Sequence, residues 1–424
     1  MKRVRRIEQA EQALLVGVAL AGGPPVEESL EELAELARGA GAQVWGQLSQ
    51  ARSRPDPACF IGRGKLEEIR AEVAVSGADL LIFDQNLTPT QQRNIEQAVG
   101  CRTIDRTQLI LDIFAHRARS HEGQLQVELA QLNYLLPRLV GRGTALSRLG
   151  GGIGTRGPGE TQLETDRRRI RRRLRKIAAE LEAVRRRRAQ QRAARQAGEL
   201  ATLALVGYTN SGKSTLFNAL TQADVRVSQK MFATLDPTVR ALRLASGRRV
   251  LLADTVGFIR DLPPGLTAAF RATLEEVQEA AMLIHVSDIS NPRHTEQDGE
   301  VEKVVAALGL DAKPRLRVFN KIDRLPAAER ARLRSRDASA FVSALQGWGL
   351  DALREELDRR LPGSRRVRLR LELSPAQGRT LALLHRHGHV LSQRYRDGRL
   401  SVEAELPEFL ARQLTRNKSG RPVG

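Results

Sequence analysis

The segment that most constrains the fold is GYTNSGKS, Gly207–Ser214, which fits the pattern G-x-x-x-x-G-K-[ST]. An apolar run, ATLALV (201–206), precedes it, and the following STLFNAL (214–220) is typical of a helix. In such a loop, backbone amides close around the β-phosphate, Lys213 reaches the β- and γ-phosphate oxygens, and the Ser214 hydroxyl ligates Mg²⁺. A chance match would lack the flanking strand and helix. The pattern therefore predicts a phosphate-binding P-loop.

Three further motifs follow in the order that such a domain requires. Asp254–Gly257 (DTVG) comes after the apolar run VLLA, Asn320–Asp323 (NKID) after RLRVF, and Ser343–Leu345 after another short strand. The first supplies an acid near Mg²⁺ and an amide for the γ-phosphate, and the third an amide near the guanine O6. Asp323 can accept both N1–H and N2–H of guanine, whereas adenine offers neither donor, so the motif selects GTP over ATP. Each string alone is weak, but their order indicates a GTP-binding domain.

With these motifs the chain resembles the HflX family of ribosome-associated GTPases (TRAFAC class, Obg-HflX-like) over nearly its whole length. The motifs that carry the resemblance are GYTNSGKSTLFN, FATLDPT, DTVGF, NKID, VSAL and the distinctive GGGIGTRGPGETQLE. The resemblance implies that Phe232–Asp236 forms the first switch, with Thr234 as the second protein ligand of Mg²⁺. The sequence by itself leaves Thr238 equally open.

The expected cofactors are GTP or GDP and Mg²⁺, held by the P-loop and the motifs that follow it. The residues predicted to bind them are Gly207, Tyr208, Thr209, Asn210, Ser211, Gly212, Lys213, Ser214, Thr215, Phe232, Ala233, Thr234, Leu235, Asp236, Asp254, Thr255, Val256, Gly257, Asn320, Lys321, Ile322, Asp323, Ser343, Ala344 and Leu345. Lys213, Thr234 and Gly257 are expected to act in catalysis, and Ser214 and Thr234 to bind the metal. Asn210 resembles the asparagine of potassium-activated GTPases and is a candidate K⁺ ligand; the alternative is that it only braces the loop.

Position 258 bears on mechanism, because Ras-like enzymes place a water-orienting glutamine directly after the DxxG glycine. Here the residue is Phe258, whose side chain can neither donate nor accept a hydrogen bond. One hypothesis is that free hydrolysis is slow and that a partner completes the site, which the resemblance identifies as the large ribosomal subunit. The alternative is that another residue of this chain positions the water.

A second glycine-rich loop, Gly150–Gly159, holds six glycines in ten residues. Its GIGTRG matches a dinucleotide-binding fingerprint, but no buried strand precedes it and no sheet-packed helix follows. A slack linker leaves unexplained the adjoining segment 161–197, with fourteen Arg or Lys against four Asp or Glu, a net +10 of the chain's total +20. The alternative is that the basic segment is a charged helix face exposed to solvent, with no binding role. We interpret the loop and the basic helix as an RNA-binding element, with Arg142, Arg148 and Arg156 on phosphates. The resemblance points to the large subunit's rRNA.

The expected fold class is α/β, a Ras-like P-loop G domain between an α/β N-terminal domain with a helical hairpin and a small α+β C-terminal domain. The boundaries are 1–119 for the N-terminal domain, 120–198 for the hairpin, 199–362 for the G domain and 363–424 for the C-terminal domain. In the hairpin, two leucine- and isoleucine-rich seams, at 125–139 and 163–184, would face each other across the glycine-rich tip. Cys59 and Cys101 form no zinc set, and His385, His387 and His389 have no carboxylate or thiol partners. No apolar run is long enough to span a bilayer, and we expect a cytoplasmic monomer that associates transiently with ribosomes or membrane.

The predicted function is a GTP-hydrolysing switch that binds RNA; the resemblance adds binding to the large ribosomal subunit and the splitting or rescue of stalled ribosomes. Two alternatives stay open. One is an ATP-driven rRNA-remodelling enzyme seated in the N-terminal domain and regulated by GTP, although no residue there establishes an ATP site. The other is a general RNA-binding protein that uses GTP for stability.

Overall fold

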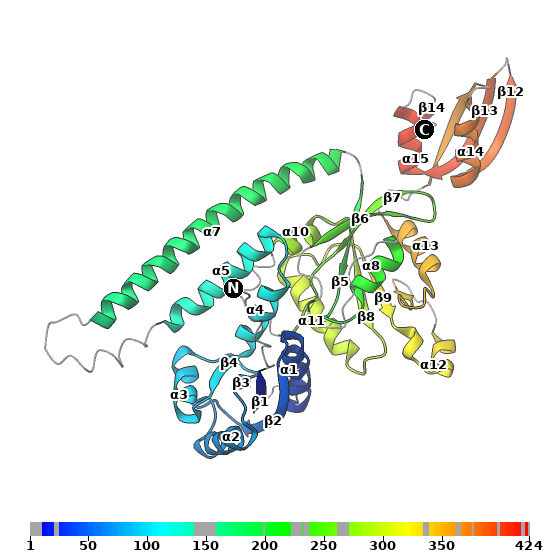
Figure 1. Cartoon of the computed structure of the whole chain (residues 1–424). Helices are drawn as coiled ribbons and strands as arrows, with labels where there is room; N and C mark the ends of the chain where they lie inside the picture. The colour runs from blue at the N-terminus through cyan, green and yellow to red at the C-terminus, as the bar shows by residue number, and fades with distance from the viewer. Residues whose placement is uncertain are drawn as a thin grey trace, which may run out of the picture. The chain divides into compact units, whose positions relative to one another are not determined.

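The computed structural model describes residues 11–20, 25–139, 158–197, 200–221, 232, 237–260, 271–333, 339–361, 366–374, 377–396, 399–416 and 420–422 (Figure 1). By their contacts the residues form two compact units. The first comprises 1–197 with 226–237 and 255–275, and the second 198–225 with 238–254 and 276–424. The four-part division expected from the sequence stays a prediction.

The first unit is built on a four-stranded parallel sheet in the order β2-β1-β3-β4. Its elements are β1 (Gln12–Leu20), α1 (Val26–Ala40), β2 (Gln43–Arg52), α2 (Arg63–Ser76), β3 (Leu80–Phe83), α3 (Pro89–Val99), β4 (Arg102–Asp105) and α4 (Arg106–Arg117). Helix α1 packs with α4, and α2 with α3. Strands β1 and β3 are buried on both faces, as their continuous apolar sequences predict.

The parallel α/β architecture is confirmed, and α3 begins with a capping box, in which the Thr88 hydroxyl accepts from the backbone of Gln91. Three elements were not predicted, namely α2, β4 and α4. Strand β4 has only four residues and is stabilised by its pairing with β3. Helix α1 exposes Glu27, Glu31 and Glu35, whereas its partly buried Glu32 pairs with the buried Arg106.

The predicted helical hairpin consists of α5 (His121–Arg138) and α7 (Pro158–Ala197), which run side by side in opposite directions (Figure 1). Leu125 and Ile177 are the buried members of the two apolar seams. Across the seam, Arg173 of α7 donates two hydrogen bonds to Glu128 of α5, at 2.6 and 2.5 Å. Pro137 lies in the last turn of α5, where its missing N–H removes one backbone hydrogen bond, while the Leu139 amide still donates to the carbonyl of Leu135.

The second unit contains a six-stranded sheet in the order β10-β9-β8-β5-β7-β6, parallel except for β6. Its elements are β5 (Thr202–Val206), α8 (Lys213–Thr221), β6 (Thr238–Arg243), β7 (Arg249–Asp254), α10 (Arg271–Glu279), β8 (Met282–Asp288), α11 (His294–Ala307), β9 (Arg315–Asn320), η1 (Ile322–Arg324), α12 (Ala327–Arg332), β10 (Ser339–Phe341) and α13 (Leu350–Arg360). One apolar cluster, including Leu205, Phe217, Leu252 and Val318, joins strands β5, β7 and β9 to α8. This is the Ras-like order, which brings the carboxyl ends of the parallel strands to one edge.

The C-terminal residues form a separate antiparallel sheet, ordered β12-β13-β11-β14. Its elements are β11 (Arg366–Leu373), α14 (Gly378–His387), β12 (His389–Arg396), β13 (Arg399–Pro407), α15 (Glu408–Arg416) and β14 (Gly420–Pro422). The chain order β-α-β-β-α-β is that of the split βαβ motif. The predicted α+β class is confirmed. No described helix of the protein combines the length and apolar character needed to cross a bilayer.

Candidate functional site

The P-loop connects the end of β5 to the start of α8, and its two glycines are sterically required. A Cβ on Gly207 would lie 2.3 Å from the carbonyl oxygen of Val286, and one on Gly212 would lie 2.3 Å from Nδ2 of Asn320. Gly212 also has φ +91°, a region that side chains disfavour. The glycines of the motif therefore allow the loop to lie directly against β8 and the NKID segment.

Lys213 is the first residue of α8, and its side chain is buried. Its ammonium donates to the carbonyl oxygens of Gly207 at 3.0 Å and Tyr208 at 2.7 Å. Burial lowers the pKa of Lys213 to about 8, and the nearby carboxylate of Asp254 only partly opposes this. A buried cation inside the loop is suited to an anionic ligand, which would restore the stability of the charged form.

Hydroxyl and carboxylate oxygens suited to the phosphates and Mg²⁺ surround the loop. The Ser214 hydroxyl donates to Oδ2 of Asp254 at 2.7 Å. Two oxygen atoms of the kind that Mg²⁺ prefers as ligands therefore lie side by side. Among the described residues, the buried hydroxyls of Thr209 and Ser211 lack a hydrogen-bond partner. Polar atoms buried in this way usually have a ligand or water as partner. This donor set therefore fits a phosphate group and a hard divalent cation.

The NKID segment anchors the P-loop. Asn320 is buried, and its Nδ2 donates to the carbonyl of Ser211 at 3.0 Å while its Oδ1 accepts from the amide of Ala344 at 3.0 Å. Lys321, held at φ +65°, donates to the carbonyl of Asn210 at 2.8 Å and pairs with Asp288 at 2.5 Å. Sequence reasoning missed Asp288, although its position at the end of β8, the strand beside β5, was a usable signal.

The predicted base-recognition residues lie together. The Ser343 hydroxyl donates to Oδ1 of Asp323 at 2.6 Å and accepts from the amide of Gln346. These bonds fix the carboxylate of Asp323 and the turn that carries the amides of Ala344 and Leu345. The Leu345 side chain is 74% exposed, so only its backbone is suited to the predicted role.

The two switch segments pack with the first unit and are described with it. Thr255, Val256 and Phe258 are buried there, as is Phe232. The predicted contacts Ala233, Thr234, Leu235 and Asp236 lie outside the described residues, and so do most of the tip loop Gly150–Gly159 and its flanking Arg142 and Arg148.

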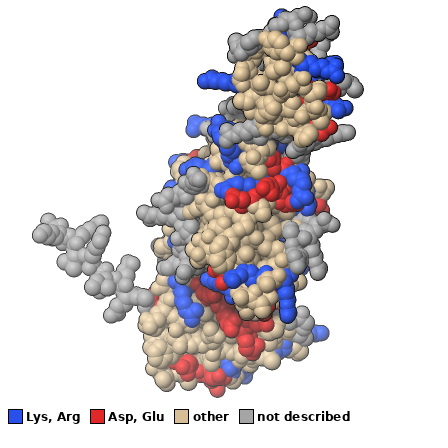
Figure 2. Space-filling model, turned by 90° about the vertical axis from the view of Figure 1, so that its right-hand side faces the viewer, with Lys and Arg blue, Asp and Glu red and all other residues tan. Residues whose placement is uncertain are grey.

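The basic helix α7 presents arginines to solvent along its described part. Arg168 and Arg169 have side chains 75% and 76% exposed and make only long ion pairs within the helix, at 3.6 and 3.7 Å. Arg171, Arg172 and Arg175 are exposed as well. By contrast, the face of the molecule drawn in Figure 2 mixes both signs of charge, with acidic side chains gathered in its lower part.

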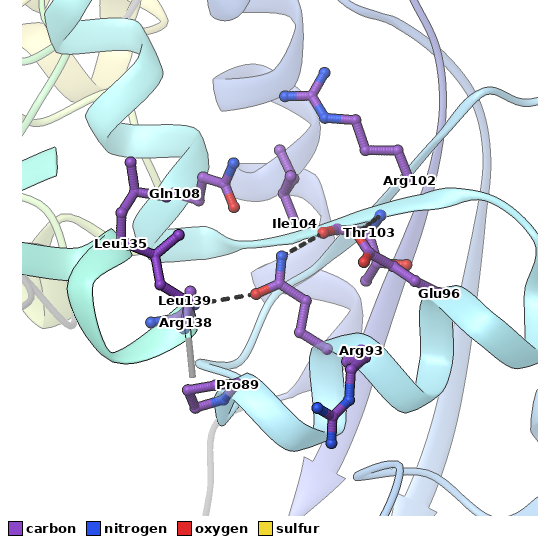
Figure 3. A pocket seen from close by; sticks show the side chains of 11 residues that line it. Pro89, Arg93, Glu96, Arg102, Thr103, Ile104, Gln108, Leu135, Arg138 and Leu139 are labelled. Atoms are coloured by element: carbon purple, nitrogen blue, oxygen red, sulfur yellow. Dashed lines mark hydrogen bonds between the residues drawn. The ribbon is translucent and has the colours of Figure 1, made fainter. Parts of the chain in front are cut away.

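The first unit also contains a cavity of about 270 Å³, walled by α3, β4, α4 and the last turn of α5 (Figure 3). Several polar side chains that line the cavity form hydrogen bonds with one another or with neighbouring residues. Gln92 donates to the carbonyl of Thr103 at 2.7 Å and accepts from Arg138 at 3.0 Å, and Arg138 also pairs with Asp105. The cavity therefore offers no cluster comparable to the P-loop. In the C-terminal sheet, His385 lies 2.8 Å from the amide of Gln393.

Comparisons with known proteins bear on the whole chain. A family profile described as GTP-binding GTPase N-terminal matches residues 27–115, one described as GTP-binding GTPase middle region matches 117–195, and one described as 50S ribosome-binding GTPase matches 202–321. The GTPase HflX of Caldanaerobacter subterraneus subsp. tengcongensis is 50% identical over 396 residues, which cover 93% of this chain and 91% of that protein. The GTPase HflX of Escherichia coli (strain K12) is 42% identical over 418 residues, 97% of each chain.

Among solved structures, a GTP-binding protein from the archaeon Sulfolobus solfataricus in complex with GDP is 27% identical, with a TM-score of 0.43, covering 81% of this chain and 96% of that chain. The sequence relatives and the matched profiles agree with the site geometry, and they show that the chain belongs to the HflX family of GTPases and hydrolyses GTP.

Proposed function

We propose that this GTPase binds the large ribosomal subunit and splits or rescues stalled ribosomes, with hydrolysis stimulated by that subunit. The observation that carries the proposal is the exposed arginine face of α7, which occurs in the same protein as a GTPase site. Exposed arginines in excess of the acidic residues along one helix suit the phosphates of folded RNA, and the glycine-rich tip would allow close backbone approach. The protein acts as a monomer of four modules in the cytoplasm.

The site residues take the following roles. Lys213 binds the β- and γ-phosphates, and Ser214 and Thr234 bind Mg²⁺, which neutralises charge on the transferring phosphoryl group when bound. The Gly257 amide contacts the γ-phosphate, and Asp323 recognises guanine with help from the amides after Ser343. The bond from Ser214 to Asp254 supports the metal site, and the bond from Ser343 to Asp323 supports base recognition.

Phe258 leaves the site without a water-orienting side chain at that position, which favours completion by a bound partner. Asn210 is a candidate ligand for K⁺ beside the phosphates. The backbone of Asn210 has φ +61°, and its main-chain carbonyl accepts a hydrogen bond from the ammonium of Lys321. This bond holds the loop through the main chain and does not use the amide side chain of Asn210. Equal hydrolysis rates in K⁺ and Na⁺ would remove the ion from the proposal.

The experiment is steady-state GTP hydrolysis across a titration of purified large subunits, with small subunits as the control. We expect a saturable increase of at least about 10-fold, lost in Lys213→Ala, because a partner that supplies transition-state contacts acts on kcat. An unchanged rate with GTP binding retained would favour the general RNA-binding protein instead. RNA remodelling driven by ATP and retained in Lys213→Ala would favour the enzyme seated in the N-terminal domain.

The arginine face is tested separately with Arg171→Gln/Arg172→Gln/Arg175→Gln. We expect weaker binding to the large subunit and a salt dependence reduced by about two to three phosphate contacts. The matched control is Arg240→Gln/Arg243→Gln/Arg249→Gln, three exposed arginines on β6 and β7. Equal losses in both variants would mean that charge in general, rather than α7, mediates binding.

A further inference from the structure

The carboxylate of Asp288, the last residue of β8, is held at both of its oxygens. Oδ1 accepts hydrogen bonds from the amide of Ser290 at 3.1 Å and from the Ser290 hydroxyl at 2.6 Å. Oδ2 lies 2.5 Å from the ammonium of Lys321, and the side chains of Asp288 and Lys321 are only 12% and 15% exposed. Asp288 is the register partner of Asn320 on β9, which brings it beside the next residue, Lys321. An ion pair of this geometry fixes the direction of the lysine side chain.

The ammonium of Lys321 also contacts the P-loop. It donates to the main-chain carbonyl of Asn210 at 2.8 Å, and Asn210 has φ +61°, an uncommon conformation for a residue with a side chain. A trans peptide directs its N–H away from its C=O, so this bond turns the amide of Ser211 away from the lysine. That amide donates to the carbonyl of Tyr208 at 3.3 Å, the same oxygen that Lys213 binds. The amide of Ser211 therefore points into the loop.

Lys321 needs the carboxylate in order to stay in this place. Without Asp288 the ammonium would be a largely buried cation with the neutral carbonyl of Asn210 as its acceptor. Removing one member of such a pair is costly, because the other keeps the cost of leaving water. Turning the lysine outward to water reduces this cost and breaks its bond to Asn210. The conformation of the P-loop at Asn210 therefore depends on a residue of β8.

We propose that Asp288 is a positioning residue for nucleotide binding, which keeps Lys321 against Asn210 and so directs the P-loop amides toward the β-phosphate. Asn210 and Gly212 both have positive φ, and backbone of this kind turns successive amides to one side, where they bind anions. Asp288 acts through Lys321, because its two oxygens are engaged by Ser290 and Lys321. The inference rests on the proposed binding of phosphates by the P-loop.

The test compares GDP with GMP, which has the same base and no β-phosphate. Asp288→Asn keeps the size of the side chain and removes its charge. In the full-length protein it should lower GDP affinity about 10-fold, the effect of a lost charge-assisted hydrogen bond, and GMP affinity by no more than about 2-fold. Isothermal titration measures GDP, and competition with a fluorescent GDP analogue measures GMP. Equal losses for both nucleotides would place Asp288 on the base side and overturn the proposal, as would full GDP affinity.

Three further variants make the test specific. Asp288→Glu, which keeps the negative charge, should bring GDP affinity back to within about 3-fold of the unaltered protein. The matched control is Glu302→Gln, which removes another ion pair of this domain, with Arg317 at 2.8 Å, and should change neither affinity. Should Asp288→Asn fail to fold, Ser290→Ala removes the 2.6 Å bond to the carboxylate and leaves the ion pair. It should lower GDP affinity about 3-fold and leave GMP affinity unchanged.

A double-mutant cycle ties the effect to the lysine. Lys321→Met should weaken GDP binding, and Asp288→Asn in that background should weaken it no further, since both changes break one contact. Additive losses would overturn the proposal. Lys213→Ala separates this inference from the proposed function, because GDP affinity retained in that variant would mean that the loop does not bind phosphate, and both would fail. Affinity lost in Lys213→Ala but complete in Asp288→Asn would overturn the inference alone.

Discussion

Asn320 donates a hydrogen bond to the main-chain carbonyl of Ser211 across 3.0 Å, and so fastens the P-loop to the strand end that precedes the base-recognition motif. The other end of the same amide accepts from the backbone of Ala344. One buried side chain thereby fixes both the loop for phosphates and the loop for guanine. The distance between the two loops depends on this amide.

Replacing Asn320 by Ala should weaken both loops together. The Ser211 carbonyl and the Ala344 amide would each lose a buried partner, at about 1–3 kcal/mol per group. We expect a clear drop in the thermal unfolding midpoint and at least about a 10-fold loss of GDP affinity. Differential scanning calorimetry and titration with a fluorescent GDP analogue measure the two. Asn320→Asp, which keeps an acceptor for Ala344 but no donor for Ser211, should fall between, and full GDP affinity in Asn320→Ala would contradict the linking role.

Asp323→Asn should change base preference. The carboxylate is suited to the N1–H and N2–H donors of guanine, whereas an amide can donate to the O2 carbonyl of xanthine. We expect GTP affinity to fall by about 100-fold or more, since a buried donor is left without an acceptor, while the affinity for XTP rises. Competition between the two nucleotides measures this. Ser343→Ala, which removes the 2.6 Å bond to Asp323, should weaken GTP without improving XTP.

GTP affinity should depend on pH through Lys213. Burial lowers the pKa of this ammonium to about 8, and phosphate binds the charged form. Affinity is therefore expected to be level below pH 8 and to fall above it, by up to about 10-fold per pH unit, until the raised pKa of the bound state is reached. Isothermal titration between pH 6.5 and 9.5 tests this. Lys213→Arg, which stays charged throughout, should remove the dependence even if its affinity is lower.

A second pH effect concerns stability. Burial raises the pKa of Asp298 in α11, but His285, whose Nε2 lies 3.2 Å away on β8, together with Ser287 and Arg317 outweighs it and leaves the pKa below its ordinary value of 3.8. A lowered carboxyl pKa contributes stability above pH 3.8 that is lost as the pH falls through the lower, folded value. Asp298→Asn should therefore unfold at a midpoint that changes less below pH 4 than that of the unaltered protein. Parallel slopes for both proteins would show that the pair contributes nothing.

Several local features followed from the sequence because they depend on neighbouring residues. The P-loop and the three motifs that follow it all require particular residues at fixed offsets. The continuous apolar sequences of β1 and β3 are typical of a buried parallel sheet. The short β4 escaped prediction because its four residues are stabilised by the strand beside them and not by their own pattern.

The sequence by itself therefore determined the family, the GTPase chemistry and the basic hairpin, since motif spacing and charge are properties of the chain. Only the tertiary structure decided which distant groups adjoin. Asp288 beside Lys321, Ser29 beside Arg260 and Phe114 beside Phe232 lie 33, 231 and more than a hundred positions apart in the chain. Such pairs depend on how helices pack on sheets, because burial of apolar faces fixes the packing and leaves the polar contacts to follow from it.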